Sequence, residues 1–159
     1  IYKKTKPKNI SLELARIKSK SLSKDNKNRL VVGSDTVVCF NGKIINKAKN
    51  IKEAKKKIKK LSSKKHSIYT SISVSLNSKE VWKTTEKTVV KIRGLSEKEI
   101  DEYLKKTGKK ILHTAGCYQI ELFGPNIIEN IKGDFFNVMG FPLFPFLNFL
   151  KKFNIKNPK

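Results

Sequence analysis

The sequence has few residues of the kind that cross-link a small protein or hold a metal through soft ligands. Two of its 159 residues are cysteine and two are histidine. Cys39 and Cys117 lie far apart in the chain, so they offer neither a disulfide framework nor a closely spaced metal-binding pair. Free cysteines are typical of reducing compartments, where they usually pack as small apolar residues. We therefore expect a cytoplasmic protein with both thiols in its core.

Long apolar runs are also missing. No stretch of 18 consecutive apolar residues occurs, which excludes a transmembrane helix of the usual length. The basic start, Ile1-Tyr2-Lys3-Lys4, lacks the apolar core of a signal peptide. Apolar residues still make up 38% of the chain, and a chain of this length can bury a sizeable core. We expect a single domain over residues 1–159 and no membrane partner.

Acidic residues are scarce beside basic ones, with 13 against 36, and the formal net charge is +23. Such a surface attracts nucleic-acid phosphates at low salt. Only three of the basic residues are arginine: Arg16, Arg29 and Arg93. Side chains that read base edges or stack on bases are more often arginine than lysine. The lysines are spread along every segment, and Trp82, Tyr69 and Tyr103 do not cluster with them, so a nucleic-acid partner is disfavoured.

A single carboxylate interrupts the most apolar part of the sequence. Short β-branched runs predict strands over 30–33 and 36–40, with a turn between them. Asn41-Gly42 then predicts a tight hairpin. A carboxylate between two buried runs is costly without a partner, so Asp35 either caps the turn or takes part in chemistry. The residues alone leave both interpretations open.

The first helix is expected over residues 10–22. Asn9 or Ser11 would cap its start. Three apolar residues fall roughly on one side and are expected to face the core: Leu14, Ile17 and Leu22. Lys18 lies at the edge of that face, one turn after Leu14.

The middle of the chain shows two clear periodicities. Residues 51–61 repeat apolar positions at helical spacing and carry lysines on the other face. Residues 66–76 alternate between a largely apolar side that includes Thr70 and a side of serines that includes Tyr69, which predicts a half-buried strand. The segment 81–92 pairs back on it, so the sheet cannot be purely parallel.

A third helix begins with a capping box formed by Ser96 and Glu99. It should end near Lys106, with Gly108 as a left-handed stop. The remaining segments are a strand over 126–131, a turn-rich loop over 133–143, and an apolar helix after Pro142 with Pro145 in its first turn.

Seven short motifs follow one another in a fixed order through residues 10–153. They are Gly33-Ser34-Asp35-Thr36-Val37-Val38 with Asn41-Gly42 after it, Lys47, Tyr69-Thr70, Leu95-Ser96-Glu97-Lys98-Glu99-Ile100, Ala115-Gly116-Cys117-Tyr118, Gly133-Asp134, and Gly140-Phe141-Pro142-Leu143. In this order they resemble the Maf family of nucleoside triphosphate pyrophosphatases, once named septum formation inhibitors.

The resemblance implies an α/β fold similar to that of inosine triphosphate pyrophosphatases. A long mixed sheet flanked by helices would form two lobes with a nucleotide cleft between them. The implied reaction splits a non-canonical or pyrimidine nucleoside triphosphate into the monophosphate and pyrophosphate with a divalent metal, Mg²⁺ or Mn²⁺. The resemblance further implies a homodimer, protection of nucleic acids from modified nucleotides, and a part in cell-division arrest.

The resemblance also assigns roles to five residues. Asp35 matches the family's proposed base, which orients or deprotonates water beside the metal. Lys18 and Lys47 match lysines that face the phosphates, although Lys47 has unusual neighbours here. Thr36 and Glu121 match positions that bear on the choice of base.

These last two positions point to different branches of the family. Thr36, directly after the catalytic aspartate, agrees with the pyrimidine-preferring branch. Glu121 stands where that branch has glutamine and instead agrees with the branch acting on 7-methyl-GTP. An ionised carboxylate accepts hydrogen bonds and cannot donate them, so it favours a donor edge or a cationic base. A purely structural pairing of Glu121 with a lysine is the competing interpretation.

Five further polar residues receive structural interpretations. Thr70, Tyr118 and Asn137 are expected to shape the cleft rather than to react. His66 and His113, the two histidines, are expected in loops or at sheet edges.

The family's Ser-x-Ser-Pro-Arg-Arg loop and the acidic metal-site residue after it have no counterpart in this chain. We therefore expect one Maf-like domain without its N-terminal phosphate-binding segment. Three hypotheses remain open: a pyrophosphatase, a non-enzymatic domain that binds nucleic acid through its lysines, and a degenerate family member retained for interaction alone.

Overall fold

The computed structural model describes residues 6–153. Its strands are β1 (Leu30–Phe40), β2 (Lys43–Ile45), β3 (Lys65–Leu76), β4 (Lys79–Ile92) and β5 (Ile128–Lys132). Its α-helices are α1 (Pro7–Ser23), α2 (Ile51–Leu61), α3 (Glu97–Thr107), α4 (Phe135–Met139) and α5 (Leu143–Lys152). Two short 3₁₀ helices follow α3: η1 (Gly108–His113) and η2 (Gly124–Asn126).

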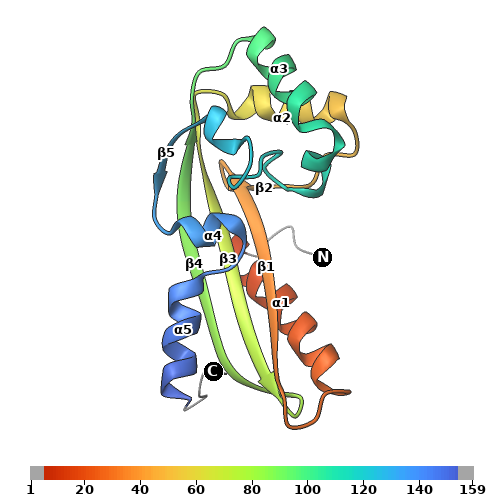
Figure 1. Ribbon diagram of the computed structural model, residues 1–159, viewed down its shortest axis with the longest axis vertical. Coiled ribbons are helices and arrows are strands. Elements are labelled where there is room, and N and C mark those ends of the chain that lie inside the picture. Colours follow the sequence, from red (N-terminus) through yellow and green to blue (C-terminus); the bar gives the residue numbers. More distant parts are fainter. Residues whose placement is uncertain (1–5, 154–159) are drawn as a thin grey trace.

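The strands form one elongated five-stranded sheet in the order β2-β1-β3-β4-β5, and every pairing is antiparallel. Figure 1 shows α1 and α5 beside the lower part of the sheet, and α2 and α3 packed together at its upper end. The larger core cluster lies in the upper lobe around α2, α3 and η1, and a smaller aromatic cluster lies where α5 meets the sheet. This arrangement confirms the predicted α/β fold with a long sheet flanked by helices, but within residues 6–153 the sheet is antiparallel throughout and not mixed as expected.

The predicted break inside the first apolar run is wrong. β1 is one continuous strand that pairs with β3 from Leu30 to Cys39. Gly33 does not make a turn; it lies directly beneath α1, where a Cβ would come within 2.2 Å of the Ala15 carbonyl oxygen and 2.6 Å of the Ser19 nitrogen. The glycine therefore permits close helix–strand contact, and Asp35 lies within a strand rather than capping a turn.

The predicted start and buried face of the first helix are also wrong. α1 begins at Pro7, and neither Asn9 nor Ser11 caps it. Proline at the first helical position needs no partner for a backbone N–H and has a suitable φ. The buried residues of α1 are Ile10, Ser11, Ala15, Ser19 and Ser23. The predicted core residues Ile17 and Leu22 are 54% and 59% exposed, because the small side chains on the other face allow the helix to approach the sheet closely.

That close approach changes the environment of β3. The apolar face was expected to be buried and the serine face exposed, yet Ser71, Ser73 and Ser75 are fully buried. α1 covers these serines, so the central part of β3 is buried on both faces. The prediction of a half-buried strand is therefore wrong there.

Several local predictions are confirmed. α2 occupies residues 51–61, and Ser96 and Glu99 form the capping box of α3. α5 follows Pro142 and has Pro145 in its first turn. Cys39 and Cys117 are buried and unpaired.

Two details differ toward the C-terminal end. Gly108 has a positive φ of 58°, but its ψ of −149° places it outside the left-handed helical region. The predicted loop over 133–143 contains α4, whose first turn is capped by the Asp134 side chain accepting from the Asn137 backbone N–H. This cap explains a helix where turn residues dominate the sequence.

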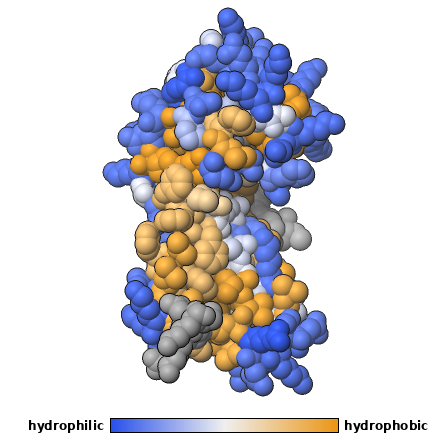
Figure 2. Space-filling model, in the orientation of Figure 1, coloured by the Kyte–Doolittle hydropathy of each residue, from blue (hydrophilic) through white to orange (hydrophobic). Residues whose placement is uncertain are grey.

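The surface divides by polarity. In Figure 2 the apolar residues gather over α4 and α5, while the upper lobe is largely hydrophilic. Within residues 6–153, none of the helices has the length and apolar character needed to span a bilayer.

Candidate active site

A cavity of about 340 Å³ opens where β1, the segment 113–121 and the end of α4 meet. All of the residues that the sequence singled out for binding or catalysis line it: Lys18, Asp35, Thr36, Lys47 and Glu121. These residues come from α1, from β1 and from two loops, so the fold gathers side chains that are separated by up to about a hundred positions.

Lys18 and Asp35 are in direct contact in this cavity. The Lys18 Nζ donates to Asp35 Oδ1 at 2.5 Å and to the Ser34 carbonyl oxygen at 2.9 Å. The Asp35 side chain is 18% exposed, and a carboxylate so placed inside a strand needs a charged partner. The pair thus explains how β1 tolerates its single carboxylate.

A chain of hydrogen bonds fixes Thr36 on the same strand. Thr70 Oγ1 donates to the Asn137 carbonyl oxygen at 2.8 Å and lies 3.0 Å from Thr36 Oγ1. A hydroxyl has one proton to donate, so Thr36 is the donor toward Thr70. The Thr36 oxygen can therefore still accept a hydrogen bond from a ligand, but its proton is engaged in the bond to Thr70.

The same region ties α4 to the sheet. Ser34 Oγ donates to the Gly140 carbonyl oxygen at 2.8 Å, and Asn137 Nδ2 donates to Thr88 Oγ1 at 2.9 Å. Thr70 and Asn137 are fully buried and do not line the cavity; they support this wall from behind through their hydrogen bonds. Ser34 and Gly140 belong to two different motifs, and the sequence carried no signal that they are in direct contact.

The loop that carries Lys47 is held by a residue that the sequence did not single out. Lys57, on α2, donates to the carbonyl oxygens of Asn46 and Lys47 at 2.6 and 2.9 Å. The neighbouring Ala48 is buried in the main core. The loop is thus anchored on both sides of Lys47 despite its unusual neighbours.

Tyr118 forms part of the opposite wall and is backed by His66. The Tyr118 hydroxyl lies 2.6 Å from His66 Nε2. His66 belongs to β3 and is 3% exposed, so its predicted placement in a loop or at an edge is wrong. Burial lowers the pKa of His66 to about 4 and raises the pKa of Tyr118 above its ordinary value. Both groups are therefore neutral at physiological pH.

Other residues of this wall are small or polar. His113, the last residue of η1, lines the cavity. A Cβ on Gly116 would come within 2.6 Å of the Tyr118 ring, so the glycine makes room for the aromatic side chain. The Ala115-Gly116-Cys117-Tyr118 motif is explained by this packing.

Glu121 lines the cavity and is exposed to solvent. No ion pair joins it to a lysine within residues 6–153. The competing structural interpretation therefore finds no support in the part of the chain that is described.

The acidic side chains of the cavity limit how a metal could be held. Across residues 6–153 no three His, Cys, Asp or Glu side chains cluster in a way that would hold a metal ion. Asp35 offers a hard carboxylate donor beside the Ser34 carbonyl. Magnesium commonly takes one or two carboxylates together with waters and substrate phosphates, so this donor set fits an ion that arrives with a phosphorylated ligand.

Comparison with known proteins places the chain in a family. The family described as "Maf-like protein" matches residues 2–153. The 7-methyl-GTP pyrophosphatase of Bartonella henselae is 37% identical over 153 residues, covering 96% of this chain and 77% of that protein. The dTTP/UTP pyrophosphatase of Bacillus cereus is 36% identical over 149 residues, covering 94% and 76% respectively. The nucleoside triphosphate pyrophosphatase of Caulobacter vibrioides is 29% identical over 145 residues, covering 91% and 72%. The chain, with its motifs in order and its five predicted site residues gathered in one cavity, belongs to the Maf family.

Proposed function

We propose that the protein is a nucleoside triphosphate pyrophosphatase that releases pyrophosphate from a triphosphate bound in this cavity. The contact between Lys18 and Asp35 carries the proposal, because it places a carboxylate and an ammonium at one point of a cavity that also contains Lys47. The names of the relatives support the same reaction.

Asp35 is the group that handles the proton in this proposal. Water bound beside its carboxylate gives up a proton to Asp35 as the water oxygen forms a bond to phosphorus. The bond between the α-phosphorus and the α,β-bridging oxygen breaks, and pyrophosphate leaves with that oxygen. Lys18 holds the Asp35 carboxylate in place before substrate binds.

The two lysines bring positive charge to the triphosphate. Hydrogen bonds from ammonium groups to phosphate oxygens are charge-assisted and stronger than neutral ones. Lys18 reaches the cavity from α1, and Lys47 reaches it from the loop after β2. Fixed donors of this kind stabilise charge that develops on the leaving pyrophosphate.

A divalent cation, Mg²⁺ or Mn²⁺, is part of the proposal. Asp35 would hold it together with phosphate oxygens of the substrate and water. When bound, the cation neutralises charge on the triphosphate.

Thr36 and Glu121 bear on which base is accepted. The Thr36 proton is committed to Thr70, and an ionised Glu121 has none to give. Both groups therefore offer only acceptors. Acceptors favour a base that presents hydrogen-bond donors or a positive charge, as in 7-methyl-GTP. They are less suited to a pyrimidine, whose carbonyl oxygens need donors from the protein.

Action in the cytoplasm and assembly as a homodimer remain predictions. The first rests on two buried, unpaired thiols, and the second on the family resemblance.

The proposed function is tested by pyrophosphate release in the presence of Mg²⁺ or Mn²⁺. The substrates are dTTP, UTP, CTP, GTP and 7-methyl-GTP. Loss of a general base typically costs on the order of 10²–10⁴ in rate, so Asp35→Asn should lose at least about a hundredfold in kcat. Asp101→Asn is the control, because Asp101 pairs with Lys55 on the surface of the upper lobe and should keep wild-type activity.

Two results would contradict the proposal. One is a wild-type protein that releases no pyrophosphate from any triphosphate. The other is an Asp35→Asn variant as active as Asp101→Asn. In either case the alternative of binding without catalysis would be examined by titrating a labelled oligonucleotide at increasing salt.

A further inference from the structure

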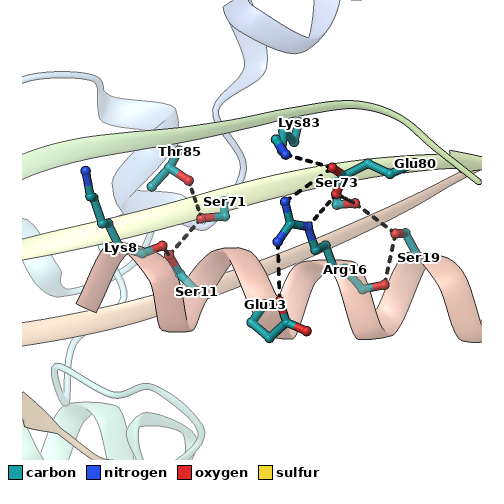
Figure 3. Close-up of polar contacts among 10 residues, drawn as sticks. All are labelled: Lys8, Ser11, Glu13, Arg16, Ser19, Ser71, Ser73, Glu80, Lys83 and Thr85. Atoms are coloured by element: carbon teal, nitrogen blue, oxygen red, sulfur yellow. Dashed lines mark hydrogen bonds and ion pairs between the residues drawn. The ribbon is translucent and has the colours of Figure 1, made fainter. Parts of the chain in front are cut away.

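α1 meets the sheet through hydroxyl groups rather than through an apolar stripe. Figure 3 shows serines of the helix facing serines of β3. Ser11 Oγ lies 2.7 Å from Ser71 Oγ, and Ser19 Oγ lies 3.0 Å from both Ser73 Oγ and Ser75 Oγ. All of these side chains are buried. The interface is therefore held by directional contacts between two segments more than fifty residues apart.

An ion pair continues this interface toward β4. Arg16 donates to Glu80 through Nε at 2.7 Å and through Nη2 at 3.3 Å, as Figure 3 shows. Glu80 also accepts from Ser73 Oγ at 3.1 Å and pairs with Lys83 at 3.0 Å. Burial raises the pKa of Glu80, but the hydrogen bonds from Arg16, Lys83 and Ser73 outweigh it and hold that pKa at about 2. Glu80 is therefore a charged acceptor shared by the helix and the sheet.

These contacts fix the position of α1 along its axis. A helix that slides by one residue moves about 1.5 Å and turns about 100°, which would separate every hydroxyl pair and the two-point Arg16–Glu80 contact. Apolar contacts alone would resist such a slip less, because they have no preferred direction. The bare backbone of Gly33 beneath Ala15 lets the helix lie close enough for the short serine side chains to reach.

The position of α1 in turn decides where Lys18 points. Lys18 is two residues beyond Arg16, and its side chain is 54% exposed. Its ammonium donates to Ser34 and Asp35, and no buried wall guides the side chain. The helix backbone is what brings its ammonium to Asp35.

We propose that Glu80 is a positioning residue: it clamps Arg16 to the sheet and so holds α1 where Lys18 meets Asp35. Glu80 does not line the cavity, so it acts through Lys18 and not on the substrate. The inference rests on the proposed function for its effect on turnover, but the position of Lys18 can be measured without turnover.

The test is a double-mutant cycle between Glu80→Gln and Lys18→Met. Coupled residues typically show interaction energies that correspond to a few-fold to a hundredfold change. Glu80→Gln should lower kcat/KM about tenfold in the wild-type background and less than about twofold when Lys18 is already methionine. A purely structural effect would lower kcat/KM by the same factor in both backgrounds, and that result would overturn the proposal.

Glu99→Gln is the matched control. Glu99 also pairs with an arginine, Arg93, at 2.7 Å, and its pKa too is held at about 2 by its hydrogen bonds. It lies at the start of α3, away from the cavity. Glu99→Gln should change stability without changing kcat/KM by more than about twofold. An equal loss of activity in both variants would overturn the proposal.

A second measurement does not need catalysis. Trace acetylation with acetic anhydride, read by mass spectrometry, reports how freely each lysine amine reacts. Release of Lys18 from Asp35 should make it react several times faster in Glu80→Gln than in Glu99→Gln, relative to the lysines of α2. Unchanged Lys18 reactivity would overturn the proposal even in an active enzyme, whereas an inactive wild type with this change in reactivity would contradict only the proposed function.

Discussion

At the scale of single residues, the role of a side chain becomes clear from the residue that it contacts, which its position in the sequence does not reveal. The sequence left two interpretations of Asp35 open, a turn cap and a part in chemistry. The unbroken strand β1 excludes the turn cap, and Lys18 is the partner of the carboxylate. The family resemblance was enough to name Lys18, Lys47 and Glu121, because each matches a position in the family's pattern. It gave no sign of Lys57 or His66, because these residues act on the cavity from behind its wall.

A prediction at this scale concerns Glu121. Replacing it with glutamine adds a donor at a position that now offers only acceptors. We expect Glu121→Gln to lower kcat/KM for 7-methyl-GTP and to raise it for dTTP and UTP, changing their ratio by about tenfold or more, since one polar contact is worth about 1–3 kcal/mol. Steady-state pyrophosphate release on both substrate types measures the ratio.

Glu129→Gln serves as its control. Glu129 pairs with Lys91 on β4, outside the cavity, so the substrate ratio should stay at the wild-type value. A ratio that is unchanged in Glu121→Gln as well would show that Glu121 does not contact the base.

At the scale of elements, hydrophobic periodicity predicted the buried face of a helix that packs on apolar neighbours. It gave the wrong face for a helix that packs on serines. α2 follows its apolar spacing, and both its ends were predicted. α1 buries serines and Ala15 instead of Ile17 and Leu22. The serines are buried because their hydrogen-bond partners lie on β3. Such partners are brought together only by the fold, so no pattern within residues 10–22 could reveal them.

Gly33 provides the prediction at this scale. Its Cβ would meet backbone atoms of Ala15 and Ser19, which cannot rotate away. Overpacking of this kind typically costs about 1–3 kcal/mol. We expect Gly33→Ala to destabilise the protein by at least this amount and to lower kcat more than about tenfold, because α1 must move and carry Lys18 away from Asp35.

Urea unfolding and pyrophosphate release measure the two effects. Gly94→Ala is the control, because a Cβ there would meet only the movable side chain of Ser63 at 3.2 Å. Wild-type stability in Gly33→Ala would mean that the close approach of α1 to β1 does not hold in solution.

At the scale of the whole molecule, three long strands join two lobes that are stabilised differently. The upper lobe has the larger apolar core, and the lower part combines the serine interface with a small aromatic cluster around Phe149. The cavity lies between them and takes residues from both. His66, from the middle strand of the sheet, is buried beside Tyr118 at this junction, so its protonation should affect the stability of the entire fold.

Burial lowers the pKa of His66 from its ordinary value of 6.5 to about 4. The unfolded chain therefore binds a proton at His66 between these pH values, and the folded protein does not. The stability that depends on neutral His66 is fully present above pH 6.5 and is lost as the pH falls to about 4. At about 1.4 kcal/mol for each pKa unit, this amounts to about 3 kcal/mol. We expect the free energy of unfolding to fall by this order between pH 7 and pH 4.5, measured in urea by the fluorescence of Trp82, the one tryptophan, which stacks on Phe149.

Two variants separate this effect from other acid-sensitive groups. His66→Gln keeps an amide near the Tyr118 hydroxyl but has no group that titrates in this range, so much of the decrease above pH 4.5 should disappear. His113→Gln removes the other histidine, which lines the cavity, and should leave the decrease in place. Glu80 and Glu99 contribute only at lower pH, because their pKa values are held at about 2, and unfolded glutamates take up protons near 4.5. An identical pH dependence in wild type and His66→Gln would therefore show that His66 does not stay neutral inside the fold.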